Sequence, residues 1–205
     1  ESFVYRYPLS KPVITSFGVM DNRPMLILKI TDSNGMYGWG EVWCNFPLTG
    51  AEHRAKLIDN VFQPLLANFN IITPEKTYEY LVSKTKILSI QSGEPGPIAQ
   101  CIAGIDIAIH DLIGKVENIS LWKKFGGNKN IIPCYASGIN PTKPEVTVKD
   151  AIKKGYSSFK LKIGFGLKKD LGNIKEIKNI LPEKSSLMVD ANQAWNLHEA
   201  IEACR

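Results

Sequence analysis

The first third of the chain repeats its apolar side chains with the period of a β-strand. Phe3, Tyr5 and Tyr7 recur at every second position, and residues 25–30 and 36–43 form two further apolar runs around a turn at 32–35. Side chains two positions apart share one face of a strand, so this pattern predicts an antiparallel sheet. The segment 15–24 mixes polar residues with Gly and Pro, and we predict a mobile loop there.

From residue 50 onward the apolar positions follow the period of a helix. They recur at three and four residues over 57–66, which predicts an amphipathic helix. Two more helices are predicted over 74–88 and 97–115. The second of these is apolar nearly all round, so it is expected to be buried between layers.

After residue 127, short apolar strands alternate with helices. Strands are predicted at 131–137, 158–163 and 186–190, and helices at 144–154, 167–181 and 197–205. Asn196 and Glu199 have the spacing of a capping box at the start of the last helix. Repeated strand–helix units specify parallel strands joined by right-handed crossovers. A closed barrel of eight such units needs about 250 residues, so we expect the chain to be part of a longer protein.

Composition narrows the class of protein. The chain has 205 residues, of which 44% are hydrophobic and 22% charged, which is typical of a folded, soluble protein and excludes disorder. Charged residues interrupt the longest apolar run, 98–114, so no membrane span is expected. The net charge of +5 comes from lysines spread at helical spacing, which argues against nucleic-acid binding. Four cysteines without metal-finger spacing indicate reduced thiols in a cytoplasmic protein.

Candidate chemistry lies on the last two predicted strands. Lys160 and Lys162 share one face of their strand, about 7 Å apart, while the apolar residues between them face the other way. Asp190 ends the next strand on the equivalent face. Two ammonium groups on the inner face of a parallel sheet are costly unless they meet anions or a cavity. The alternative is that both lysines are exposed on an edge or one-sided strand and that Asp190 caps the following turn.

Five segments in order carry a resemblance to a known family. They are Gly38-Trp39-Gly40-Glu41, residues 103–115 with the Phe125-Gly126-Gly127 link, Tyr135-Ala136-Ser137, Lys160-Leu161-Lys162 and Asp190-Ala191-Asn192. Together they resemble the mandelate racemase / muconate lactonizing enzyme branch of the enolase superfamily. The resemblance implies an α+β capping domain over 1–115, a linker over 116–130 and, over 131–205, the first three strand–helix units of a TIM-type (β/α) barrel. The barrel is expected to be incomplete in this chain.

The resemblance also implies a reaction. It is removal of the α-proton of a small carboxylate substrate to give an enediolate stabilised by one Mg²⁺ ion, as in a racemase, epimerase or isomerase. Lys162 would be the base, with neighbouring cations and partial burial favouring its neutral amine. Lys160 would hold the substrate carboxylate electrostatically, and Asp190 would be the first metal ligand. The remaining ligands and the opposite-face acid or base would lie beyond residue 205, so the chain by itself is predicted to be inactive.

The resemblance implies further substrate contacts. Ser137 and Asn192 are candidates for hydrogen bonds to substrate, although each fits turn chemistry equally well. Two capping-domain segments, 15–24 and 43–50, would select the substrate. Met20, Trp43 and Phe46 on these segments would line the pocket or would pack inside the capping domain.

Other functions remain open at this point. An acid-sugar dehydratase would share the first chemical step, and a non-catalytic scaffold or binding protein would keep only the fold. A small parallel α/β binding module would leave Lys160 and Lys162 exposed to solvent. A homo-oligomer is the default expectation for the assembly.

Overall fold

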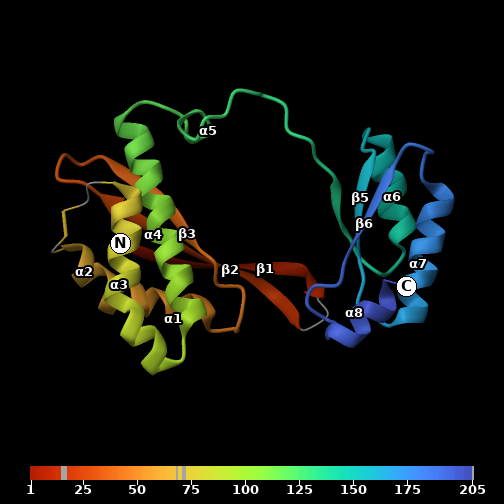
Figure 1. Ribbon diagram of the computed structural model, residues 1–205, viewed down its shortest axis with the longest axis horizontal. Helices are drawn as coiled ribbons and strands as arrows, with labels where there is room; N and C mark the ends of the chain where they lie inside the picture. The colour runs from red at the N-terminus through yellow and green to blue at the C-terminus, as the bar shows by residue number, and fades with distance from the viewer. Residues whose placement is uncertain (15–17, 68, 71–72, 205) are drawn as a thin grey trace. The chain divides into compact units, whose positions relative to one another are not determined.

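The chain divides into two compact units. The structure, a computed structural model, describes residues 1–205 apart from 15–17, 68, 71–72 and 205. One unit comprises Glu1–Lys11 and Asp21–Asn128, and the other comprises Pro12–Met20 and Lys129–Arg205 (Figure 1). The domain limits expected from the sequence, at 115 and 130, stay a prediction.

The first unit is built on an antiparallel sheet, as the apolar pattern predicts. Strands β1 (Ser2–Ile14), β2 (Val19–Thr31) and β3 (Tyr37–Val42) lie in that order. The register of β2 and β3 runs from Leu26 opposite Val42 to Thr31 opposite Tyr37. The turn between them is closed by the Asp32 carboxylate, which accepts hydrogen bonds from the main-chain N–H groups of Asn34 and Met36, both at 2.9 Å.

The prediction of a mobile loop over residues 15–24 is wrong for residues 19–24. Strand β2 begins at Val19, so residues 19–24 are strand, while residues 15–17 lie outside the described residues. Met20 and Pro24 are buried within this strand. Pairing along a long two-stranded ribbon outweighs the local preference of the Gly- and Pro-containing sequence for a loop.

A helical segment follows β3 and starts earlier than the periodicity predicts. It comprises α1 (Gly50–Leu57), the π-helical turn η1 (Ile58–Phe62) and α2 (Gln63–Ala67). Pro64 has no N–H to donate to the carbonyl four residues earlier, which accounts for a wider turn just before it. The apolar period of 57–66 therefore identified the helix but not its first turns.

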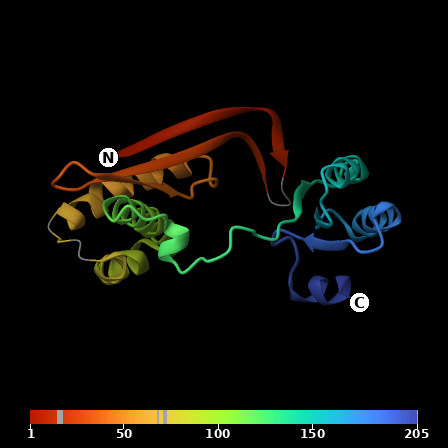
Figure 2. The ribbon, with the colours of Figure 1, turned by 90° about the horizontal axis from the view of Figure 1, so that it is seen from above.

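Two long helices complete the core of the first unit. Helix α3 (Pro74–Ser92) is capped by Thr73, whose side chain accepts a hydrogen bond from the Lys76 N–H, and α4 (Pro95–Val116) follows it. A four-residue helix, α5 (Leu121–Lys124), comes next. Figure 2 shows the helices of this unit on one face of the sheet. The core between these layers is lined by Leu26, Leu28, Val42, Phe62, Leu81, Ile102, Ile105 and Ile109.

Helix α4 packs directly on the main chain of β3. A Cβ atom built on Gly40 would lie 2.0 Å from the Gly104 carbonyl oxygen, and one on Gly38 would lie 2.0 Å from the Ala108 oxygen. A Cβ on Gly104 would lie 2.4 Å from a methyl group of Val42. Only residues without a side chain permit this approach, so these glycines set the spacing between sheet and helix.

Among the described residues, one helix is long and apolar enough to cross a membrane by length and composition, and it is α4. We expected the charged residues within 98–114 to rule out a membrane span. Helix α4 nevertheless meets both the length and the composition requirement. In this structure α4 lies against β3 and α3, with nine of its residues buried, as a core helix does.

The second unit is a parallel sheet with helices, as predicted. Strands β4 (Ala136–Ile139), β5 (Ser158–Lys162) and β6 (Ser186–Asp190) lie in that order and pair in parallel. Helices α6 (Pro144–Lys153) and α7 (Leu167–Ile180) lie side by side and cover one face, and α8 (Leu197–Ala203) follows β6 (Figures 1 and 2). The capping box of Asn196 and Glu199 is formed. The core under α6 and α7 is lined by Ile139, Val148, Phe159, Leu161, Ile163 and Ile177.

The strand predicted at 131–137 is largely wrong. Strand β4 begins only at Ala136, and Ile131 and Ile132 are 79% and 81% exposed. The pairing with β5 joins Ala136 to Phe159 and Ile139 to Leu161. An apolar run becomes a strand only where a neighbouring strand supplies hydrogen bonds, and residues 131–135 have no such neighbour in the described structure.

We expect Gly40→Ala to destabilise the first unit by about 3 kcal/mol or more, because the added methyl group would overlap the main chain of α4. Gly172→Ala is the control, since Gly172 lies within helix α7 with open space around its Cβ position and is not followed by proline. That control should change the free energy of unfolding by no more than about 1 kcal/mol. Urea unfolding followed by circular dichroism measures both, and equal effects would contradict the packing argument.

Candidate active site

Strand β5 directs its two lysines away from the helices. Phe159 and Leu161 are fully buried under α6 and α7, so Lys160 and Lys162 lie on the opposite face of the sheet. Their side chains are only 22% and 25% exposed, and β5 is the central strand of the three. Lys160 and Lys162 therefore do not lie on an edge strand, whereas the alternative of a one-sided strand stays open, because α6 and α7 cover only the opposite face.

The strand register brings a carboxylate to both lysines. In the parallel pairing of β5 with β6, Lys162 lies opposite Asp190. The Lys162 Nζ donates a hydrogen bond of 2.7 Å to Asp190 Oδ2, and the Lys160 Nζ lies 3.2 Å from the same oxygen. Two ammonium groups and one carboxylate from neighbouring strands therefore meet at one point, as the alternation of side chains predicts.

Asn192 completes this group from the turn after β6. Its side-chain oxygen accepts a hydrogen bond of 2.5 Å from the Lys162 Nζ, and its main-chain N–H donates one of 2.9 Å to Asp190 Oδ1. The residue has a φ of +47°, in the left-handed region that asparagine tolerates well. The turn chemistry expected for Asn192 is thus present, and its contact with substrate stays a prediction.

The electrostatics of the group follow from these contacts. The hydrogen bond from Lys162, and after it the N–H of Asn192, lowers the pKa of Asp190 from 3.8 to about 2. The side chain of Tyr135 and the Asp190 carboxylate raise the pKa of Lys160, because both stabilise its charged form. The Asp190 carboxylate thus compensates the positive charges of both half-buried lysines.

Tyr135 is a neighbour of the site that sequence reasoning missed. The Lys160 Nζ lies 5.2 Å from the centre of its ring, within reach of a cation–π interaction. Tyr135 directly precedes β4, so the interaction joins the first strand of the sheet to the second. The sequence places an aromatic residue at that position, but only the strand order reveals which side chain it meets.

The other side chains predicted to contact the substrate lie in both units. Ser137 lies on β4 and is exposed, and no described contact joins it to the lysines or to Asp190. Met20 is buried in β2, which favours packing. Trp43 is half-exposed after β3, and Phe46 precedes a cis peptide bond to Pro47. A role of these four side chains in substrate binding stays a prediction.

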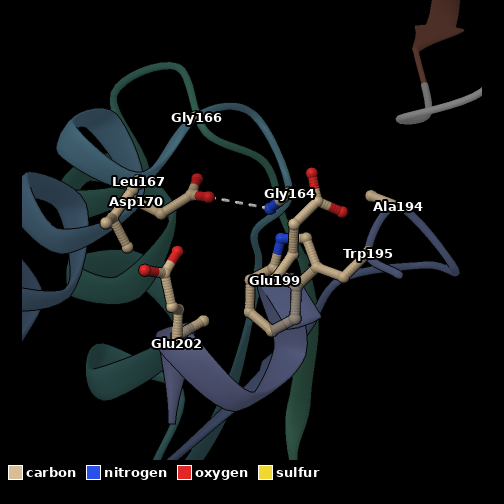
Figure 3. A pocket seen from close by; sticks show the side chains of 9 residues that line it. Gly164, Gly166, Leu167, Asp170, Ala194, Trp195, Glu199 and Glu202 are labelled. Carbon is tan, nitrogen blue, oxygen red and sulfur yellow. Dashed lines mark hydrogen bonds between the residues drawn. The ribbon is translucent and has the colours of Figure 1, made fainter. Parts of the chain in front are cut away.

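The loop that follows β5 is held by a buried carboxylate. Asp170, in the first turn of α7, accepts hydrogen bonds from the main-chain N–H groups of Gly164 at 2.9 Å and Phe165 at 3.2 Å. Figure 3 shows this carboxylate pointing to Gly164, and the two residues line a hollow of about 220 Å³ together with Trp195 and Glu199. Asp170 thereby fixes the loop just beyond Lys162. It was missed in the sequence, where its signal is an acidic residue in the first turn of a helix.

The group around Asp190 fits part of a Mg²⁺ site. A carboxylate is the hard oxygen ligand that Mg²⁺ prefers, and near-octahedral coordination requires several such ligands or water. No cluster of three or more His, Cys, Asp or Glu side chains able to hold a metal ion occurs within the described part of the chain. The role of Asp190 as a ligand of Mg²⁺ therefore stays a prediction.

Comparison with protein families gives two matches. The family described as mandelate racemase / muconate lactonizing enzyme, N-terminal domain, matches residues 2–126. The family described as enolase C-terminal domain-like matches residues 145–205. The first match alone covers more than half of the chain.

Curated relatives are enzymes of similar sequence. A 3,6-anhydro-α-L-galactonate cycloisomerase of Streptomyces coelicolor is 29% identical over 98% of the chain and 56% of its own length. An N-succinyl-L-Arg/Lys racemase of Bacillus cereus is 27% identical over 94% and 51%. An L-Ala-D/L-Glu epimerase of Clostridium acetobutylicum (27%, over 96% and 53%) and an arabinonate dehydratase of Saccharolobus solfataricus (26%, over 92% and 54%) are also similar. The chain spans about half the length of these relatives.

Solved structures agree with the fold. A mandelate racemase/muconate lactonizing enzyme from Bordetella bronchiseptica is 42% identical with a TM-score of 0.88, over 98% of the chain and 53% of that structure. A racemase from Streptomyces coelicolor with bound magnesium is 28% identical with a TM-score of 0.86, over 100% and 57%. Magnesium is thus bound in this related structure.

We expect Asp190 to titrate near pH 2 in metal-free protein. Because its folded-state pKa lies below the ordinary 3.8, its contribution to stability is present above pH 3.8 and is lost as the pH falls toward 2. The contribution should be between about 1 and 2 kcal/mol, reduced by the partial exposure of the side chain. Acid unfolding of wild type and Asp190→Asn measures it, and the gap between the two should close in this pH range.

Asp150→Asn is the control for this titration, because Asp150 is an exposed carboxylate paired with Lys153 on the surface of α6. Its acid unfolding should follow that of wild type. A carboxyl resonance of Asp190 that titrates at pH 3.8 or above would show that the lysines do not hold it as described.

Proposed function

The chain belongs to the mandelate racemase / muconate lactonizing enzyme branch of the enolase superfamily, and we propose that its intact parent protein is a Mg²⁺-dependent enzyme that removes the α-proton of a carboxylate substrate. Its fold is a capping domain with an antiparallel sheet, followed by strand–helix units of a barrel that is incomplete in this chain. The observation that carries the proposal is the convergence of Lys160, Lys162 and Asp190 on one point.

The geometry supports a division of labour between the two lysines. A proton next to a carboxylate is weakly acidic, so its removal requires both a base and positive charge near the substrate oxygens. Lys162, at the end of β5, is proposed to take the proton at its Nζ. Lys160, held by Tyr135 and Asp190 in its charged form, is proposed to hold the substrate carboxylate. Bound Mg²⁺ would supply further positive charge beside that carboxylate, and Asp190 is proposed to be one of its ligands.

The reaction class that fits best is racemisation, epimerisation or another isomerisation. Relatives that span the chain at 27% identity are an N-succinyl-L-Arg/Lys racemase and an L-Ala-D/L-Glu epimerase. Such reactions require a second acid or base on the opposite face of the substrate. A second lysine in that position would indicate the dipeptide-epimerase or lactonizing type, and a His–Asp pair would indicate the mandelate racemase type.

A dehydratase acting on an acid sugar is the second candidate. An arabinonate dehydratase that is 26% identical over 92% of the chain supports it. Both candidates begin with the same proton abstraction and differ in whether a leaving group departs afterwards. The substrate in either case is proposed to be a small carboxylate, and the protein is proposed to be a cytoplasmic homo-oligomer with reduced cysteines.

In the intact parent protein, Lys162→Met should lower the rate of α-proton exchange by about a hundredfold or more, because it removes the amine of the proposed base and keeps an unbranched side chain that is only one atom shorter. The measurement is Mg²⁺-dependent exchange with D₂O followed by NMR on three probes: N-succinyl-L-lysine, L-Ala-L-Glu and arabinonate. Loss of water from arabinonate would identify the dehydratase.

Lys153→Met is the matched control, since Lys153 lies on the surface of α6 with a side chain that is 79% exposed. Its exchange rate should equal that of wild type. Wild-type parent protein that binds these carboxylates without any Mg²⁺-dependent exchange would instead indicate a non-catalytic protein that kept the fold.

The 205-residue chain alone should hold Mg²⁺ weakly, with a dissociation constant above about 1 mM, because Asp190 is the single carboxylate proposed as a ligand and the described residues contain no cluster of three or more metal-binding side chains. Isothermal titration calorimetry at neutral pH measures this constant, with Asp190→Asn as the comparison. Clear Mg²⁺-dependent exchange of an α-proton by the chain alone would contradict the prediction.

A further inference from the structure

Two arginines hold the segment that leads from β3 into α1. Residues 43–50 carry Trp43 and Phe46, and their main-chain carbonyl groups accept hydrogen bonds from guanidinium groups. Arg54 donates to the Phe46 carbonyl at 3.3 Å and to the Gly50 carbonyl at 3.0 Å. Arg6 donates to the Leu48 carbonyl at 2.9 Å. Three carbonyl groups of one short segment are thus bound by side chains from outside it.

Arg54 is a rigid anchor for this segment. The residue is only 3% exposed, and its Nε donates a hydrogen bond of 2.7 Å to the Gln100 side chain on α4. A buried charge is costly unless its donors are satisfied, and these acceptors satisfy three different nitrogens of the guanidinium. Because α4 is the central helix of the core, Arg54 ties residues 46 and 50 to the best-packed part of the unit.

Arg6 connects the same segment to the first hairpin. From β1, its Nη1 donates to Asn22 Oδ1 on β2 at 2.9 Å. Its Nη2 donates to the Leu48 carbonyl, and Nε and Nη2 grip the Glu52 carboxylate of α1 at 2.6–3.0 Å. The Arg6 hydrogen bond lowers the pKa of Glu52. One guanidinium therefore contacts two segments that lie far apart in the sequence.

These two segments are the ones for which the family resemblance implies substrate selection. Asn22 lies in the described part of the first, residues 18–24, and Leu48 lies in the second, residues 43–50. An ion pair between Arg6 and Glu52 would suffice to attach α1 to β1. The additional hydrogen bonds to Asn22 and to the Leu48 carbonyl are not needed for that attachment. They are directional, because the N–H groups of the Arg6 guanidinium are fixed in one plane.

We propose that Arg6 is a positioning residue that couples residues 18–24 to residues 43–50, so that the two segments select the substrate as one element, with Arg54 as the anchor of the second. The selection of substrate rests on the proposed function. The coupling itself rests only on the contacts of the guanidinium groups within the first unit.

Hydrogen–deuterium exchange on the 205-residue chain tests the coupling. Arg6→Gln should raise amide exchange tenfold or more in peptides covering 18–24 and also in peptides covering 43–50, while exchange in the core of α4 stays unchanged. Lys11→Gln, an exposed cation on the same strand, should change neither segment. Faster exchange in only one segment, in neither, or throughout α4 would overturn the proposal.

Glu52→Gln separates the coupling from a simple ion pair. This variant removes the charge that Arg6 grips and leaves the acceptors on Asn22 and Leu48 in place. Its effect on exchange in the two segments should be less than threefold. An effect equal to that of Arg6→Gln would mean that the arginine only attaches α1 to the sheet, which would overturn the proposal.

The consequence for selection is measured in the intact parent protein. Arg6→Gln should change the ratio of kcat/KM for N-succinyl-L-lysine over L-Ala-L-Glu fivefold or more, through KM, with kcat for the better probe within threefold of wild type. An unchanged ratio would overturn the role in selection. A wild-type parent without α-proton exchange on any carboxylate would contradict the proposed function, and the exchange experiment on the chain would still decide the coupling.

Discussion

The parallel register of β5 and β6 is the constraint on which the candidate site depends. It sets Lys162 opposite Asp190 and brings Lys160 to the same carboxylate oxygen. A slip of one residue would turn every side chain of a strand to the other face. The burial of Phe159 and Leu161 under α6 and α7 opposes such a slip, so the apolar half of β5 holds the polar half in place.

The first unit depends on a different contact, the direct approach of α4 to β3. Gly38, Gly40 and Gly104 leave no room for side chains between the two elements. The segment after β3 is attached to the same helix through Arg54 and Gln100. The Gly-Trp-Gly-Glu motif therefore contributes close packing, whereas the Lys-x-Lys motif contributes charge. The family resemblance rests on residues of both kinds.

Both units keep charged side chains partly or fully out of water and satisfy them with named partners. In the second unit, one carboxylate compensates two lysines, and its low pKa reflects that arrangement. In the first unit, two guanidinium groups bind main-chain carbonyls of one segment. Desolvation offsets part of the attraction between such charges, while their hydrogen bonds fix the directions of the side chains involved. Their positions therefore point to the parts of the molecule where geometry matters for function.

Features that depend on neighbours within a few residues could be predicted from the amino-acid order alone. These include the alternation that places Lys160 and Lys162 on one face, the capping box at Asn196 and the helical periods of α3 and α4. Tertiary structure alone decided that residues 19–24 are strand, that 131–135 are not, and that Tyr135 meets Lys160. It also decided the partners of Arg6, which lie 16 to 46 positions away. Periodicity and capping are local, whereas strand pairing and a long side chain's acceptors depend on elements that only the folded chain brings together.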